Sequence, residues 1–200
     1  MKTLHIIASP RWDRSKSRQL WEFLSSKLAW EVITLDLNNS EIPFVSNDVI
    51  TYDYGYMKYE DLSSEDKKIA DLQKKYIEQL KSVDNVVVSS PLWNFWMPAI
   101  LKWYIDLVAK VWDTFKMTET GLVWLLTNVK NLYIVETKGS VYAWTAWQDI
   151  ETLDKNIRQA FAFMWVTNAK TFVLEWATSK DEESLAADVE KVKEEIVKSI

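Results

Sequence analysis

Residues 85–98 read NVVVSSPLWNFWMP, and this stretch decides the fold. Its valine run is too short for a helix and is apolar on both faces, as in a central parallel strand. The chain then changes to Ser, Pro, Asn and aromatic residues before a second proline opens a helical pattern. In an open α/β sheet, ligands bind at such strand-to-helix loops. Trp93 and Phe95 flank Asn94, and this combination of flat apolar faces and one amide suits a planar heteroaromatic ring.

Strand-like runs alternate with helical patterns along the chain. Strands are predicted at 3–8, 31–37, 85–89, 131–136 and 170–174. Helices are predicted around 20–28, 69–80, 98–109, 149–164 and 185–196. Strands separated in this way by helices imply right-handed crossovers and a parallel sheet. The sequence therefore predicts a doubly wound, five-stranded α/β sheet of strand order 2-1-3-4-5, with helices on both faces.

Composition limits the class of protein. A chain of 200 residues with 48% hydrophobic content fits one well-buried domain, so residues 1–200 are expected to form a single domain. The net charge of −5, with Lys and Arg scattered among acids, argues against a nucleic-acid partner. No apolar stretch approaches a membrane-spanning length, so no membrane partner is expected. The chain has no Cys, which excludes thiolate chemistry and permits a cytoplasmic setting.

The single histidine, His5, lies inside the apolar run 4–8. We expect a structural histidine there rather than a catalytic one. With one His and no Cys, a zinc site or a Ser-His-Asp triad has little support. No metal site is predicted.

Glycine is scarce, and this restricts the kind of phosphate site. Gly55, Gly121 and Gly139 are the only glycines, so neither a G-x-G-x-x-G fingerprint nor a Walker A loop can be written. The first predicted strand is followed instead by residues 9–18, SPRWDRSKSR. Hydroxyls, cations and backbone N–H groups at a helix N-terminus hold a phosphate without glycine. An ordinary serine helix cap explains the same residues.

The loops that follow the first and third predicted strands meet at the switch point of a 2-1-3-4-5 sheet. A phosphate site beside an aromatic loop describes a mononucleotide with a flat ring, and FMN fits. The loop after the fourth strand, TKGSVY at 137–142, lies on the same edge. Gly139 permits close backbone approach, and Lys138 can stabilise negative charge on a reduced flavin ring. A plain strand-end turn also explains this loop.

Five motifs carry a family resemblance. They are LHIIASPR at 4–11, SKSRQL at 15–20, SPLWNF at 90–95, MPAILK at 97–102 and YID at 104–106. With these motifs the chain resembles the FMN-dependent NADH:quinone oxidoreductases, also known as azoreductases, which have a flavodoxin-like fold. The resemblance implies that FMN is bound by Ser9, Arg11, Ser15, Lys16, Ser17, Pro91, Leu92, Trp93, Asn94, Phe95, Thr137, Lys138, Gly139 and Ser140.

The resemblance also implies an activity and an assembly. Members are homodimers with flavin sites at the subunit interface. In a ping-pong cycle, NADH gives a hydride to the flavin, and a quinone or azo compound then takes it from the same face, so no catalytic side chain is required. Phe163 matches a substrate-pocket position, with Tyr142 near it, although a core role for Phe163 is also open. Two alternatives remain: a flavodoxin-like FMN electron carrier, or an engineered scaffold that has lost flavin binding.

Two regions depart from a plain reading of the fold. Residues 38–63 form a long segment with four tyrosines, which indicates an aromatic lid, a partner-contacting loop or a small ordered hairpin. The chain also holds twelve tryptophans and three glycines, where about fourteen glycines are usual. By the resemblance, Trp stands at positions that relatives fill with Gly or another small residue. These are Trp12, Trp96, Trp112, Trp124, Trp144, Trp147, Trp165 and Trp176.

Glycine in such turns supplies a positive φ or room for a ligand, and a bulky residue there costs roughly 1 to 3 kcal/mol. We interpret the pattern as engineered, as computed or as an error in the recorded sequence. Trp96, Trp144 and Trp147 are expected to crowd the flavin edge or to stack on it, unless these side chains turn to the surface or to a dimer interface.

Overall fold

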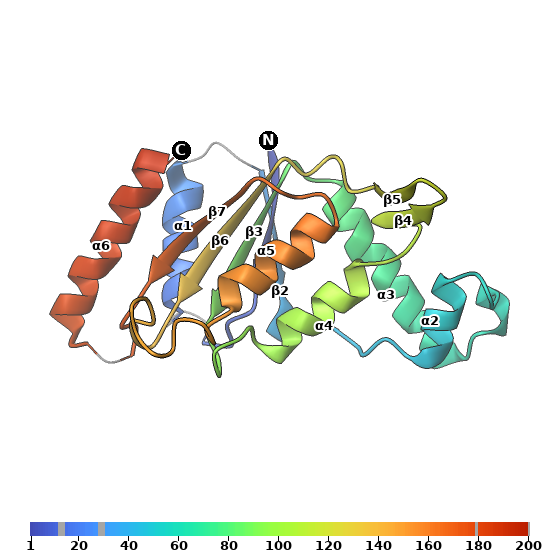
Figure 1. Cartoon of the computed structure of the whole chain (residues 1–200), viewed down its shortest axis with the longest axis horizontal. Coiled ribbons are helices and arrows are strands. Elements are labelled where there is room, and N and C mark those ends of the chain that lie inside the picture. Colours follow the sequence, from blue (N-terminus) through green and yellow to red (C-terminus); the bar gives the residue numbers. More distant parts are fainter. Residues whose placement is uncertain (12–14, 28–30, 179, 200) are drawn as a thin grey trace.

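A computed structural model describes residues 1–11, 15–27, 31–178 and 180–199 (Figure 1). Its centre is a five-stranded parallel sheet of order β2-β1-β3-β6-β7. The strands are β1 (Lys2–Ile7), β2 (Glu31–Asp36), β3 (Asn85–Pro91), β6 (Asn131–Thr137) and β7 (Ala169–Leu174). The predicted strands and the predicted 2-1-3-4-5 order are confirmed, because β4 and β5 form a separate hairpin.

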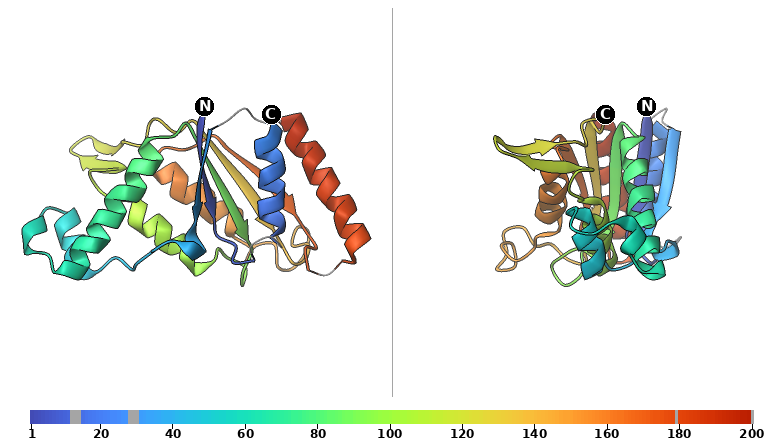
Figure 2. Two further views of the ribbon diagram at one scale, coloured as in Figure 1. Left: turned by 180° about the vertical axis from the view of Figure 1, so that it is seen from behind. Right: turned by 90° about the vertical axis from the view of Figure 1, so that its right-hand side faces the viewer.

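Helices cover both faces of the sheet, as the end-on view in Figure 2 shows. One face carries α1 (Lys16–Lys27) and α6 (Glu182–Ser199), and the other carries α3 (Ser64–Lys81), α4 (Ala99–Val108) and α5 (Leu153–Phe163). The valine run of β3 contributes side chains to the hydrophobic cores on both faces of the sheet. Val86 and Val88 pack on the side of α3 to α5, whereas Val87 packs against α1 and α6. None of the described helices combines the length and apolar character needed to cross a bilayer.

Two helix boundaries differ from the prediction. Helix α5 begins at Leu153 rather than at residue 149, with Thr152 as its N-cap residue, and the Glu151 side chain just before the helix accepts a hydrogen bond from the Leu153 N–H (2.9 Å). Pro98 stands just before the first residue of α4 instead of inside its first turn. The predicted helical position Leu28 lies outside the described residues.

The tyrosine-rich segment is ordered but is not a hairpin. It holds two short 3-10 helices, η2 (Leu37–Asn39) and η3 (Tyr59–Asp61), on either side of the helix α2 (Asn47–Asp53). Ser46 caps α2 by accepting the Val49 N–H at 3.2 Å. The hairpin alternative for this segment is therefore wrong. A hairpin of β4 (Phe115–Thr118) and β5 (Gly121–Trp124) exists elsewhere, where none was predicted.

Several tryptophans adopt a backbone that favours glycine. The φ angles are +70° at Trp112, +60° at Trp144, +88° at Trp165 and +58° at Trp176. A left-handed backbone costs an L-residue roughly 1–2 kcal/mol, so these turns store strain. Three more of the predicted glycine-type positions lie outside this region of φ, namely Trp96, Trp124 and Trp147. Trp12 lies outside the described residues.

His5 has a structural setting. It is buried on β1, its Nε2 atom lies 2.7 Å from the Ser89 hydroxyl, and its ring packs against Trp21 with centroids 4.5 Å apart. Burial lowers the pKa of His5 well below 6.5, so the ring is neutral at pH 7. This arrangement fits the expectation of a structural histidine.

Two buried tyrosines differ in whether their hydroxyl groups have a hydrogen-bond partner, so they allow the cost of an unpaired buried hydroxyl to be measured. The Tyr76 hydroxyl donates to the Glu41 carbonyl at 2.8 Å, whereas the Tyr104 hydroxyl is fully buried and has no hydrogen-bond partner among the described residues. Because an unsatisfied buried hydroxyl is costly, Tyr104→Phe should raise the free energy of unfolding by about 1 kcal/mol. Tyr76→Phe should lower it by about the same amount. Urea denaturation measures both, and a loss of stability in Tyr104→Phe would contradict the assignment.

Candidate cofactor site

A cavity of about 270 Å³ opens at the edge of the sheet where the parallel strands end. Loops that follow β1, β3, β6 and β7 surround it, as the switch-point argument requires. Its lining consists of Ser9, Pro10, Arg11, Ser15, Lys16, Pro91, Leu92, Trp93, Thr137, Lys138, Gly139, Tyr142, Ala177 and Thr178. Most of the residues predicted to bind the cofactor are therefore brought together on one edge.

Some predicted residues lie just outside this lining. Ser17 is buried behind it, with its hydroxyl 3.1 Å from that of Ser15. Asn94 lines an adjoining groove instead. The rings of Phe95 and Tyr142 meet edge to face with their centroids 5.9 Å apart, so Phe95 contacts the cavity lining through Tyr142. Ser140 is partly buried and does not line the cavity.

Phe163 lies away from the cavity. It is half-exposed at the end of α5, and its ring contacts Phe115 of β4 with centroids 4.6 Å apart. Within one chain the structure therefore does not bring the two predicted substrate-pocket residues together, since Tyr142 lines the cavity and Phe163 does not.

Three lining residues were not predicted: Pro10, Ala177 and Thr178. The last two follow β7, whose carboxyl end meets the same edge, so the topology alone contained the signal for them. The Ala177 N–H donates to the Lys138 carbonyl at 2.9 Å, which ties this loop to the one after β6. A Cβ atom at Gly139 would lie 3.0 Å from the Thr178 hydroxyl oxygen, so a larger residue at this position would require the Thr178 side chain to shift.

One end of the cavity suits a phosphate group. Ser9 and Ser15 present nearly buried hydroxyls, and helix α1 begins at Lys16. A helix N-terminus attracts anions through its free N–H groups and its dipole. Arg11 and Lys16 add two cations to the lining. The residues present therefore fit the phosphate end of a mononucleotide such as FMN.

The other end of the cavity borders a tight turn at 93–96. Trp93 and Trp96 exchange two backbone hydrogen bonds of 2.9 Å, and the central residues Asn94 and Phe95 have φ angles of +48° and +66°. This is the geometry of a type I′ turn, which favours Asn followed by Gly. Phe95 therefore holds a strained backbone beside the cavity, as residues at binding sites often do.

The three tryptophans predicted to crowd the flavin edge or to stack on it lie around the cavity and not in its lining. Trp144 is 96% exposed, Trp147 stacks on Phe95 with ring centroids 5.5 Å apart, and Trp96 borders the adjoining groove. None of these three described residues lines the cavity itself.

Lys138 brings a buried charge cluster to the cavity wall. Its ammonium nitrogen lies 2.8 Å from Glu151 and 3.4 Å from Glu136, the last charged residue of β6. Glu136 is fully buried. Desolvation raises the pKa of Glu136 to about 7, although the nearby Lys138 charge opposes the shift.

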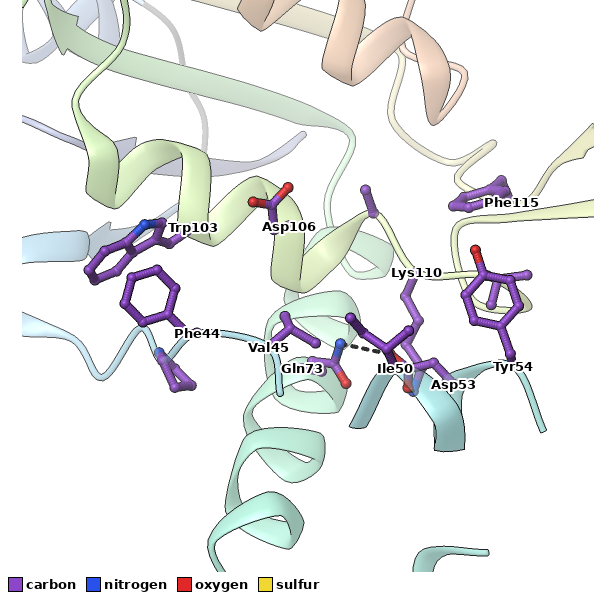
Figure 3. A pocket seen from close by; sticks show the side chains of 13 residues that line it. Phe44, Val45, Ile50, Asp53, Tyr54, Gln73, Trp103, Asp106, Lys110 and Phe115 are labelled. Atoms are coloured by element: carbon purple, nitrogen blue, oxygen red, sulfur yellow. Dashed lines mark hydrogen bonds and ion pairs between the residues drawn. The ribbon is translucent and has the colours of Figure 1, made fainter. Parts of the chain in front are cut away.

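A second cavity, of about 350 Å³, lies between α2, α3 and α4 (Figure 3). Its walls are mostly apolar, with Phe44 and Trp103 in ring contact at 3.8 Å. Lys110 is the cation of its lining, and it pairs with Asp53 at 3.0 Å. Asp106 in the same lining pairs with Lys102, so the lining offers a phosphate no cation that is free of a carboxylate partner among the described residues. The cavity at the strand ends is therefore the candidate cofactor site.

Comparison with known proteins agrees with this geometry. Residues 1–196 match the family described as Flavodoxin-like fold. An FMN-dependent NADH:quinone oxidoreductase of Brevibacillus brevis is 33% identical over 164 residues, which are 80% of this chain and 78% of that protein. Another, from Bacillus cereus, is 34% identical over 163 residues, with the same two shares. The crystal structure of an azoreductase from Bacillus anthracis str. Sterne has a TM-score of 0.85 and 29% identity, and the likeness covers 99% of both chains.

Proposed function

The chain belongs to the flavodoxin-like family of FMN-dependent NADH:quinone oxidoreductases and azoreductases, and from that premise we propose that it is an FMN-dependent oxidoreductase using NADH to reduce quinones or aromatic azo compounds. The single observation that carries this proposal is the cavity at the strand ends. It combines buried hydroxyls, cations and a helix N-terminus at one end with Trp93 and Tyr142 at the other.

Each end of the cavity has a separate task in this proposal. Ser9, Ser15 and Lys16 bind the phosphate, because hydroxyls and N–H groups at a helix start are donors to anionic oxygens. Leu92 and Trp93 hold the flat ring by apolar contact. FMN bound there would supply the hydride-transfer chemistry, so the side chains would bind and orient rather than react. Lys138 lies where it favours negative charge on the ring.

A ping-pong order is part of the proposal. One cavity serves the ring end, so the nicotinamide and the acceptor are expected to use the same place in turn. Initial rates should give parallel lines in double-reciprocal plots. Intersecting lines would contradict the alternation of substrates. We also propose a cytoplasmic location, where NADH is available as the electron donor.

We further propose that the protein works as a homodimer. Large apolar side chains are exposed on the part of the surface around the second cavity and α5. They include Phe44, Ile50, Tyr54 and Phe163. Exposed patches of this kind mark interaction surfaces, and a partner copy would also give Phe163 a route to a cavity that its own chain does not offer. Sedimentation equilibrium tests this, and a monomer at all concentrations would contradict it.

The proposed function has a direct test. The purified protein is mixed with FMN, desalted and examined for the flavin absorption band, and NADH oxidation is then followed with a quinone and with an azo dye. Retained flavin with acceptor-dependent NADH oxidation is the expected result. A colourless protein would exclude both the enzyme and the electron carrier, and would leave the scaffold that has lost flavin. Retained flavin without turnover would favour the carrier.

Removing the two cavity hydroxyls should weaken the affinity for FMN. Ser9→Ala combined with Ser15→Ala deletes two hydrogen bonds to the phosphate, each worth about 1–1.5 kcal/mol, so the Kd should rise by roughly 30- to 150-fold. Flavin fluorescence quenching measures the Kd. Ser25→Ala with Ser26→Ala, on the exposed side of α1, is the matched control and should leave it unchanged. An unchanged Kd in the cavity variant would mean that the phosphate lies elsewhere.

A further inference from the structure

A buried acid beside the cofactor cavity has no part in the binding described so far. Glu136 lies at the carboxyl end of β6, opposite Ser90 of β3 and Val173 of β7. Side chains alternate along a strand, and Ile134 packs in the core shared with α5, so Glu136 points to the same side. Its side chain is 0% exposed, although a glutamate is almost never fully buried unless it is paired.

The pairing of Glu136 is incomplete. Neither of its carboxylate oxygens has a hydrogen-bond partner among the described residues, and its single close cation is Lys138 at 3.4 Å. Lys138 lies nearer to Glu151, at 2.8 Å, and the other oxygen of Glu151 accepts the Leu153 N–H at the start of α5. Glu151 therefore has the stronger hold on the ammonium group. The Lys138 ammonium group interacts less strongly with Glu136.

The charges around Lys138 decide what an anion in the cavity would meet. Two carboxylates, Glu136 and Glu151, share one ammonium group, so the three groups sum to −1 when both acids are ionised. Asp154 on α5 adds a further negative charge that Glu136 senses, although it pairs with Arg158 at 2.8 Å. If Glu136 is protonated, the cluster of three becomes neutral. An anion in the cavity then meets a cation shared with one acid instead of two.

We propose that Glu136 is a positioning residue for the cofactor, whose carboxylate takes up a proton from solvent when an anionic phosphate enters the cavity that Lys138 lines, so that the Lys138 charge is less offset within that cavity. This rests on the proposed function, because FMN is the ligand in question. The uptake needs no reacting atom of the cofactor. It follows from linkage: a ligand that binds the protonated form more tightly must draw a proton onto the protein.

The pH range of this exchange is set by the surroundings of Glu136. Burial raises its pKa to about 7, and the negative charges of Asp154 and Glu151 act in the same direction, whereas Lys138 opposes them. Both forms of the carboxyl are therefore populated near neutral pH in the free protein. A negative ligand charge nearby raises the pKa further, because like charges disfavour ionisation.

The test is to count the protons bound together with FMN. Isothermal titration calorimetry at pH 7.5, in buffers of different ionisation enthalpy, gives this number directly. The unmodified protein should take up about half a proton more per FMN than Glu136→Gln, which mimics the protonated acid. Between pH 6.5 and 8.5 its Kd for FMN should rise several-fold relative to that of Glu136→Gln. Titration of the FMN phosphate itself is common to both proteins and cancels in the comparison.

Two further variants separate a charge effect from a structural one. Glu136→Leu should lose the proton uptake as Glu136→Gln does, because both lack the acid. Glu175→Gln removes the same charge just after β7, from a residue that lines a different depression, and should keep the full uptake. Equal uptake in the unmodified protein and Glu136→Gln would overturn this proposal alone. No FMN binding in the unmodified protein would overturn the proposed function, and this proposal with it.

Discussion

A variant with glycine at positions 112, 144, 165 and 176 should be more stable than one with alanine at the same four positions by about 4 kcal/mol, or about 1 kcal/mol per site. All four residues have φ between +58° and +88°. Alanine keeps the strain of this backbone, whereas glycine adopts it freely. Both variants lose the same indole contacts, so the difference isolates the backbone. Guanidinium denaturation monitored by far-UV circular dichroism measures it.

Trp144 allows a comparison with the unmodified chain, because its side chain is 96% exposed and has little packing to lose. Trp144→Gly alone should raise the free energy of unfolding by roughly 1 kcal/mol. The control is Trp147, whose φ lies outside the left-handed region. There Trp147→Gly should be less stable than Trp147→Ala by about 0.5–1 kcal/mol. If alanine were as favourable relative to glycine at the four positive-φ sites as at position 147, the turns would be unstrained.

Removal of the ammonium group at Lys138 should also be costly. Lys138→Met keeps the length of the side chain but leaves Glu136 buried without its cation, and we expect a loss of about 2–3 kcal/mol in the free energy of unfolding at pH 8. The loss should shrink to about 1 kcal/mol or less at pH 5, where Glu136 is protonated in either protein. Urea denaturation at the two pH values measures the change.

The sign of this pH dependence follows from Glu136. Its pKa in the folded protein, about 7, lies above the ordinary value of 4.5, so its contribution to stability is fully present below about pH 4.5 and is lost as the pH rises through 7. Without Lys138 the folded pKa rises further, and the loss at pH 8 is larger. Adding Glu136→Leu to Lys138→Met removes the titrating group and should restore most of the stability at pH 8. A loss equal at both pH values would contradict this explanation.

The central sheet was predictable because its strands have a simple signature. The run at 86–88 is apolar on both faces, and the structure uses both faces. The hairpin β4–β5 was not predictable in the same way, since its strands have four residues each and show no clear alternation. The start of α5 was misplaced because residues 149–152 lie outside the helix, where the side chain of Glu151 contacts Lys138 and accepts the Leu153 N–H. Such a tertiary contact leaves no periodic signal in the sequence.

The candidate site was predictable to the extent that topology determines it. Loops after β1, β3 and β6 lie where the switch-point rule places them, and the loop after β7 could have been added by the same rule. Side-chain placement was harder. Helical periodicity assigns Phe163 to a face of α5 but does not indicate that its ring meets Phe115 of the hairpin. Similarly, Glu136 at a strand end resembles a solvated residue until α5 covers it.

The turn at 93–96 affects how the cofactor arrives. Two adjacent residues, Asn94 and Phe95, already hold positive φ angles, and backbone hydrogen bonds close the turn on both sides. The loop has therefore lost its conformational freedom before any ligand is present. Association then requires no folding of the loop, and the entropy of ordering is not subtracted from the affinity. In the proposed site, FMN would therefore meet a turn that is already closed, and its exchange would not require this turn to refold.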